Sequence, residues 1–78
     1  MYANSNITVE GIGMTKIIFD CNNSSYATAL KNSIGTVSGA TVTVSSDKVT
    51  VTFENAVETF AIAKLTAQVR IDSITVNP

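Results

Sequence analysis

The 78-residue sequence contains no histidine and no tryptophan, a single cysteine, and few charged residues, which make up 14 % of the chain. Without histidine the chain cannot form a serine–histidine or cysteine–histidine catalytic pair. One cysteine cannot form an internal disulfide, a zinc site of Cys and His ligands, or a cysteine-ligated iron–sulfur cluster. We therefore expect no metal, no cofactor and no enzyme activity.

Charge of either sign is also scarce. Five basic and six acidic residues give a net charge of −1, and no run of like charges occurs. This balance argues against binding to nucleic acid or to an anionic membrane surface. No apolar run approaches the roughly 18 residues of a membrane helix, and the first residues lack the basic and apolar regions of a secretory signal. The sequence therefore predicts a cytoplasmic protein.

Neutral side chains supply most of the polarity, since 26 residues are Ser, Thr or Asn, and 45 % of the chain is hydrophobic. This composition is typical of a folded chain and not of a highly charged disordered tail. A chain this short buries only about 60–65 % of its unfolded surface, so association would add much to its stability. We expect a single domain that forms a homo-oligomer, most simply a homodimer.

The spacing of apolar residues from Lys16 to Gly35 predicts a strand followed by a helix. Lys16–Cys21 alternates with Ile17, Phe19 and Cys21 on one face, which is typical of a strand. A helix is predicted next, because Asn22–Ser24 offers N-cap residues and Gly35 a C-cap. Its apolar residues recur at helical spacing: Tyr26, Ala27, Leu30 and Ile34.

The residues from Ala40 onward predict two strands joined by a tight turn, then a second helix and a last strand. Ala40–Ser45 and Val49–Phe53 alternate apolar residues with Thr or Ser and predict a β-hairpin that turns at Ser46-Asp47. Asn55 and Glu58 have capping-box spacing, so a second helix is predicted, with a buried stripe of Val57, Phe60, Ala61 and Leu65. The last strand, from Val69 to Val76, changes phase and predicts a bulge near Asp72-Ser73.

Residues 16–45 can be laid over residues 48–77 as two strand–helix–strand halves. Joined by the hairpin, they predict an α+β domain of the ferredoxin-like split βαβ class (βαββαβ), with a four-stranded antiparallel sheet and two helices on one face. This domain would span residues 14–78. Residues 1–13 would be a leader or, through Ile7–Val9, an extra edge strand.

Cys21 is the one candidate for chemistry. It lies between the first strand and the first helix, where helix amides can lower a thiol pKa. Cys21-Asn22-Asn23-Ser24 is similar, over four residues, to the Cys-x-x-Ser of monothiol redox proteins, and the strand–Cys–loop–helix order resembles the phosphocysteine subunits of sugar phosphotransferase systems. A phosphocysteine loop would contain glycines, where this chain has Asn22-Asn23, and a thioredoxin-like domain would place a proline against the thiol, whereas the one proline here is Pro78 at the end of the sequence. The alternative is that Cys21 continues the apolar phase of its strand and fills the core.

Binding through the sheet is the stronger hypothesis. The face opposite the helices would carry Ile18 and Asp20, and its candidate interaction residues are Thr41, Thr43, Thr50, Thr52, Arg70 and Asp72. This face lacks the aromatic residues that stack RNA bases. The two edge strands, Ala40–Ser45 and Val69–Val76, carry few charges and invite pairing with another strand.

Three functions remain open. The first is a non-catalytic protein-interaction module that acts through a sheet edge or the Thr-rich face, such as an accessory, inhibitor or structural subunit of phage or mobile-element origin. The second is a thiol enzyme or phosphocysteine carrier that uses Cys21. The third is a ligand-binding regulatory dimer.

Overall fold

Four strands and one helix follow one another in the computed structural model, which describes residues 2–78. They are β1 (Ile7–Cys21), α1 (Ser24–Ile34), β2 (Ala40–Ser45), β3 (Lys48–Ile62) and β4 (Ile71–Asn77). The strands form one sheet in the order β2-β3-β1-β4, and every neighbouring pair is antiparallel. The chain is a small α+β domain, with β2 and β4 at the edges of its sheet.

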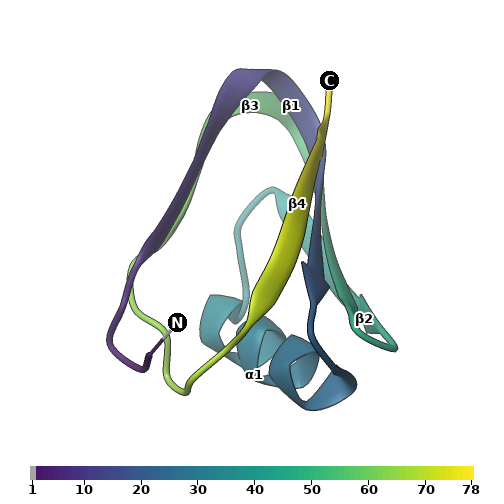
Figure 1. Cartoon of the computed structure of the whole chain (residues 1–78). Helices are drawn as coiled ribbons and strands as arrows, with labels where there is room; N and C mark the ends of the chain where they lie inside the picture. Colours follow the sequence, from purple (N-terminus) through teal and green to yellow (C-terminus); the bar gives the residue numbers. More distant parts are fainter. Residues whose placement is uncertain (1) are drawn as a thin grey trace.

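Bulges bend β1 and β3 together into an arch (Figure 1). Gly11–Gly13 of β1 lie opposite the single residue Glu58, and residues 53–56 of β3 lie opposite the single residue Thr15. Extra residues in one strand of a pair bend that strand and increase its local twist. Gly13 has a φ of 62°, a left-handed conformation that glycine adopts without steric cost.

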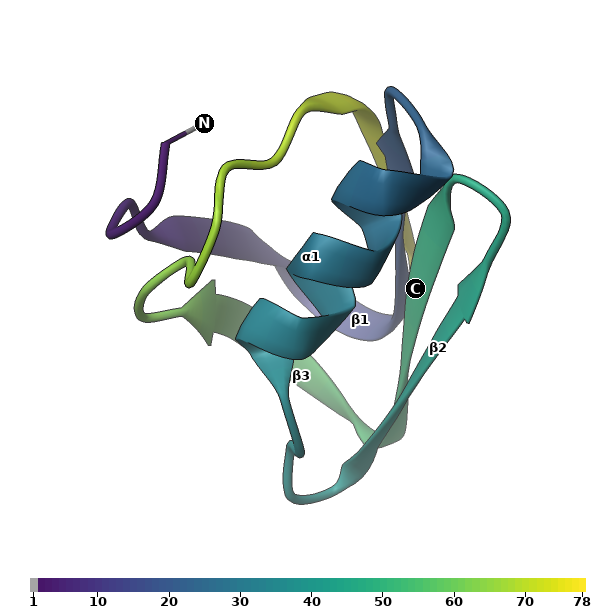
Figure 2. The same ribbon diagram turned by 90° about the horizontal axis from the view of Figure 1, so that it is seen from below.

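The bend divides the sheet into two legs. The two-stranded leg pairs residues 7–10 with residues 59–62, and the four-stranded leg contains the rest of β1 and β3 together with β2 and β4. α1 lies across the open end of the arch, between the legs (Figures 1 and 2). The inner side chains of both legs and the apolar face of α1 therefore share one core. Its fully buried large side chains are Phe19, Met14, Ile17, Leu30, Leu65, Val49, Val51 and Val69.

The predicted second helix is wrong. Residues 55–62 belong to β3, and Leu65 lies in the loop that follows it. Phe60 and Ile62 are buried while Ala61 between them is exposed, which is strand alternation. The pairing with another strand favours the extended conformation here, because Thr59–Ile62 forms a ladder with Ile7–Glu10. A short helix in the same place would be only marginally stable by itself.

The ferredoxin-like class is therefore wrong as well: the domain has one helix, and its second half is strand, loop, strand. Of the two alternatives for residues 1–13, a leader or an extra edge strand through Ile7–Val9, the extra strand is wrong, since Ile7–Val9 is the first part of β1. The first strand, the first helix and the hairpin are confirmed. The bulge near Asp72 is confirmed too, because Cys21 pairs with Ile71 and Asp20 pairs with Ser73, which leaves Asp72 between them without a ladder partner.

α1 is fixed at both ends. At its start the Asn23 side chain accepts a hydrogen bond from the Tyr26 amide, 3.0 Å away, and at its end Gly35 has a φ of 66°. Near the end Ser33 Oγ accepts a hydrogen bond from the amide of Thr66, at 3.0 Å. α1 thus holds in place the loop that connects β3 to β4.

Candidate functional site: the outer sheet face and its edges

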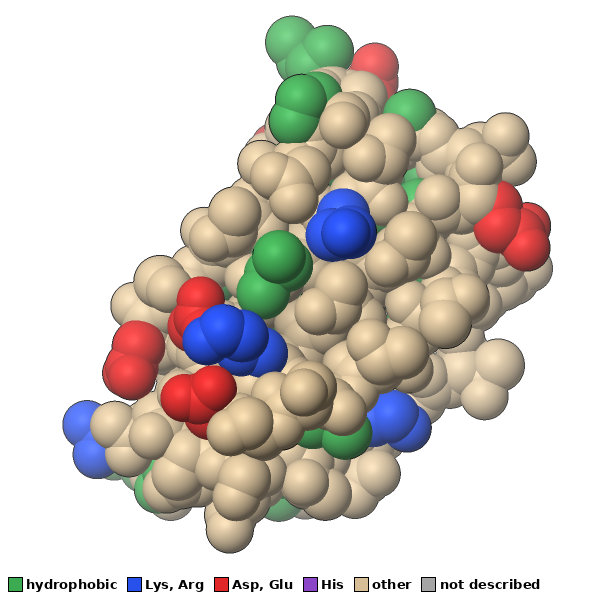
Figure 3. Space-filling view, turned by 90° about the vertical axis from the view of Figure 1, so that its right-hand side faces the viewer, with side chains coloured by type: hydrophobic (Ala, Val, Ile, Leu, Met, Phe, Trp, Pro, Cys, Tyr) green, Lys and Arg blue, Asp and Glu red, His purple; other side chains and the backbone are tan. Residues whose placement is uncertain are grey.

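The face of the four-stranded leg that points away from the core is an ordered array of twelve side chains, which we call the outer face. The strand pairings place them in three rows, each running from β2 through β3 and β1 to β4. The rows are Thr41, Thr52, Lys16, Asn77; Thr43, Thr50, Ile18, Thr75; and Ser45, Lys48, Asp20, Ser73. None of the twelve is buried. On the side shown in Figure 3, hydrophobic and charged side chains are few and scattered, and the rest is backbone and other side chains.

The third row contains two of the three charged side chains of this face, Lys48 and Asp20, and pairs them with each other. Lys48 Nζ forms an ion pair with Asp20, and Ser73 Oγ donates a second hydrogen bond to the Asp20 carboxylate at 3.2 Å. Lys48 Nζ also lies 3.6 Å from Asp47. The hydrogen bond from Lys48 lowers the pKa of Asp20, and the same bond raises the pKa of Lys48. Both charges are satisfied at one end of the face, so its centre is left neutral.

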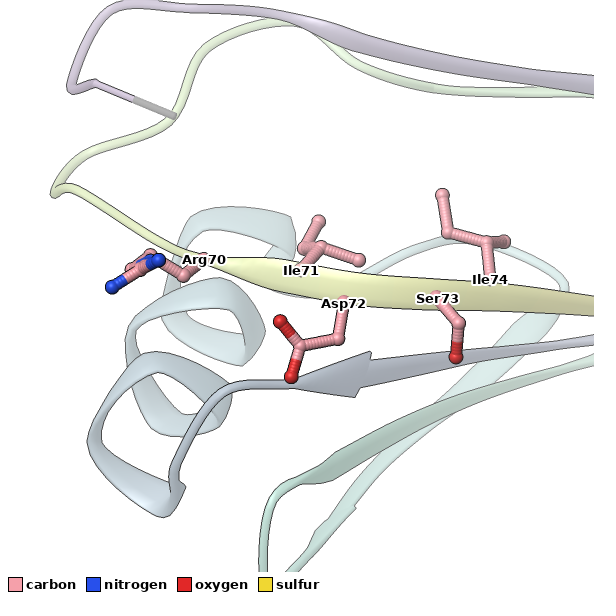
Figure 4. A pocket seen from close by; sticks show the side chains of 5 residues that line it. All are labelled: Arg70, Ile71, Asp72, Ser73 and Ile74. Atoms are coloured by element: carbon pink, nitrogen blue, oxygen red, sulfur yellow. The ribbon is translucent and has the colours of Figure 1, made fainter.

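The structure brings together four of the six predicted interaction residues: Thr41, Thr43, Thr50 and Thr52 lie next to one another on β2 and β3. Arg70 precedes β4, and Asp72 lies at the bulge. In Figure 4 Asp72 points to the same side as Ser73, whereas Ile71 and Ile74 point to the other side.

Sequence reasoning missed three outer-face residues of β4, namely Ser73, Thr75 and Asn77. The prediction recognised the change of phase at the bulge, but the face residues it took from this strand, Arg70 and Asp72, both come from before the phase of Ile74 and Val76 begins. The alternation of Ile74 and Val76 was the signal that could have identified them.

The two edge strands expose apolar side chains on the inner side of the sheet. Val44 on β2 is 37 % exposed, and Ile74 and Val76 on β4 are 43 % and 39 % exposed. β2 carries no charged residue, and β4 carries none from Ser73 to Asn77. Charged residues, prolines and covering loops normally protect such edges from pairing with other chains. Both edges are open to strand addition.

A hollow lies along the first part of β4 (Figure 4). Its volume of about 520 Å³ falls within the range of small-molecule sites. However, its lining consists of the consecutive residues Arg70 to Ile74, so polar groups from other elements do not converge on it. This geometry suits a segment laid beside β4 better than an enclosed ligand.

Cys21 lies in the core. Its side chain is 2 % exposed, and its strand neighbours in phase, Ile17 and Phe19, are fully buried. Burial raises the pKa of the Cys21 thiol, and the negative charges of Asp47, Asp20 and Asp72 raise it further. A thiol enzyme or phosphocysteine carrier needs a lowered pKa and access for its substrate, and this position supplies neither.

We expect Cys21 of the native protein to resist alkylation. Because its pKa is raised, the buried thiol stays protonated and stabilises the fold below the ordinary cysteine value of about 8.5, and this contribution is lost as the pH rises through the raised pKa. At pH 8 the reaction with iodoacetamide should be at least roughly 100-fold slower than in urea, since it requires local opening. Reaction of the native protein at the rate of a free thiol would contradict this placement.

Among residues 2–78, no group of three or more Cys, Asp or Glu side chains is arranged to hold a metal ion. Within the same part of the chain, no helix has the length and apolar character needed to cross a membrane. The chain matches no protein-family model, no curated protein and no solved structure.

Proposed function

We propose that this protein is a small, non-catalytic protein-interaction module that binds its partner through an exposed edge of its sheet. Its size and low charge suit an accessory, inhibitor or structural subunit. The same proposal includes a phage or mobile-element origin and a cytoplasmic location. The function is association and not chemistry, because its one nucleophilic thiol is buried and its Asp20 carboxylate is occupied by Lys48.

One observation carries the proposal. Five large hydrophobic side chains are exposed among the described residues, and three of them, Val44, Ile74 and Val76, lie on the two edge strands. Each edge thus combines unpaired backbone groups with alternating apolar side chains, and neither Ala40–Ser45 nor Ser73–Asn77 contains a charged residue. Strand addition uses the backbone groups for affinity and the alternate side chains for specificity.

The second row of the outer face allows a lysine scan that separates an edge from the face. Thr43 lies on the β2 edge, Thr75 on the β4 edge, and Thr50 on β3 between them. We expect one of the two edge variants, Thr43→Lys for a partner on β2 or Thr75→Lys for a partner on β4, to abolish capture by the tagged protein, because a lysine on an edge strand disfavours pairing. Thr50→Lys should reduce capture by less than about threefold, since surface substitutions usually change free energies by under 0.5 kcal/mol.

Circular dichroism and thermal melting of the three variants serve as the control, since all three should melt close to the wild type. Loss of the partner with Thr50→Lys alone would shift the binding site to the Thr-rich outer face. Retention of the partner by all three variants would overturn binding through either the edges or this face.

A further inference from the structure

The free edge of β4 has a sequence that matches itself when reversed. Ser73-Ile74-Thr75-Val76-Asn77 is polar, apolar, Thr, apolar, polar, and it contains no charge. In an antiparallel pair the side chains directly opposite one another lie on the same face of the sheet. When two copies of this segment pair about a two-fold axis, polar side chains therefore lie opposite polar ones and apolar side chains opposite apolar ones.

We propose that the β4 edge binds the β4 edge of a second copy of this chain, antiparallel, with Thr75 opposite the partner's Thr75. This inference rests on the proposed function and specifies its edge and its occupant. On the inner side Ile74 packs against the partner's Val76, which covers the two apolar side chains that the single chain leaves about 40 % exposed. On the outer face Ser73 lies opposite the partner's Asn77.

Other symmetric registers fit less well. A shift that centres the pair on Ile74 brings Asp72 opposite the partner's Val76, and it includes the bulge in the ladder. A shift that centres the pair on Val76 leaves a ladder of only three residues within β4, Thr75 to Asn77. The register about Thr75 is the longest one that leaves the bulge outside the ladder.

Charge complementarity selects a second copy over an unrelated segment. Among residues 2–78 the side-chain ion pairs are those of Lys48 with Asp20 and Asp47, so within this part of the chain Lys16 and Asp72 have no ion-pair partner. Lys16 lies beside Asn77 on the outer face, and the proposed register places the partner's Ser73 next in that row. The partner's Asp72 follows on the same face.

The distance between Lys16 and the partner's Asp72 in this register suits an ion pair. Two strand spacings put about 10 Å between the backbone of Lys16 and that of the partner's residues 72 and 73, a gap that the long lysine stem and the aspartate side chain can close together. The two-fold axis produces this pair twice, once at each end of the ladder. Such isologous contacts close the dimer and leave the β2 edges free.

The test is sedimentation equilibrium of the full chain. The wild type should form a dimer, and because a five-residue ladder is at the small end of protein interfaces, its dissociation constant should lie in the micromolar range. Thr75→Lys and Thr75→Glu each place like charges directly opposite one another at the axis, which destabilises a cross-strand pair. Each variant alone should raise the dissociation constant about tenfold or more.

An equimolar mixture of Thr75→Lys and Thr75→Glu should restore dimerisation, because opposite charges then meet at the axis. Thr43→Lys is the matched control, since it changes the same residue type in the same row at the β2 edge, and it should leave the dimer intact. A monomeric wild type at millimolar concentration, or a dimer lost with Thr43→Lys and kept with Thr75→Lys, would overturn the proposal.

The proposed function can survive that failure. A monomer that captures a different protein, and loses it with Thr75→Lys, would show that β4 is a binding edge for another occupant and would reject the second copy. A monomer whose edge variants capture the same proteins as the wild type would reject both the dimer and the proposed function.

Discussion

Ile62→Asp should unfold the domain. Ile62 is 4 % exposed and pairs with Ile7 on the inner side of the two-stranded leg, so the variant would bury a carboxylate without a partner. Burial of an unpaired charge costs several kcal/mol, and a domain of this size has roughly 4–12 kcal/mol of stability in total. Urea denaturation followed by circular dichroism would measure the loss.

Ala61→Asp is the control that separates a strand from a helix. Ala61 is exposed in β3, so this variant should lose less than about 0.5 kcal/mol. In the helix predicted from the sequence, Ala61 would lie on the buried stripe and Ile62 outside it, and the two variants would exchange their effects. A folded Ile62→Asp protein beside an unfolded Ala61→Asp protein would contradict the strand.

The helix prediction failed because the sequence of residues 55–65 satisfies two patterns at once. Phe60 fits a helical stripe with Val57 and Ala61, and it fits strand alternation with Ile62. The choice depends on a partner about 50 residues earlier in the chain, Ile7–Glu10, which the prediction treated as a separate leader or edge strand. Local periodicity contains no information about that pairing, so tertiary contacts overrode it.

The elements that were predicted correctly have local causes. Asn23 and Gly35 fix the ends of α1, and the Ser46-Asp47 turn fixes the register of the hairpin. The Thr-rich part of the outer face follows directly from that register, because alternation along Ala40–Ser45 and along Lys48–Phe53 sends the four Thr of these segments to the same side. The contribution of β4 could not be derived so simply, since its phase depends on where the bulge at Asp72 falls.

The arch explains why such a short chain forms a closed core with one helix. Bending β1 and β3 lets the two-stranded leg cover the side of the core that a second helix would otherwise cover. Phe53, next to the bend, and Phe60, on the two-stranded leg, meet edge to face with their ring centres 5.6 Å apart. Ala40 and Val42 of β2 and Ile71 of β4 pack against this core from the inner side of the sheet. Because the arch completes the core from within the sheet, the outer face and the free backbone edges of β2 and β4 remain open for binding.

Leu65→Ala should cost about 2–5 kcal/mol of unfolding free energy, the range measured when a buried leucine is truncated. Leu65 is fully buried although it lies in the loop between β3 and β4. Its amide donates to the Ser5 carbonyl oxygen, and its own carbonyl oxygen accepts a hydrogen bond from the Asn4 amide, both at 2.8 Å. The loop thus anchors its one leucine to the start of the chain and closes the core where the predicted helix would have ended.

The neighbouring Lys64 is exposed, so Lys64→Ala is the matched control and should change the stability by less than about 0.5 kcal/mol. Hydrogen exchange gives an independent measurement, since the amides of Leu65 and Asn4 should be protected in the wild type and should exchange faster in Leu65→Ala. Loss of protection at Asn4 would show that the buried leucine holds both segments together. An unchanged melting temperature in Leu65→Ala would mean that Leu65 and its loop do not close the core.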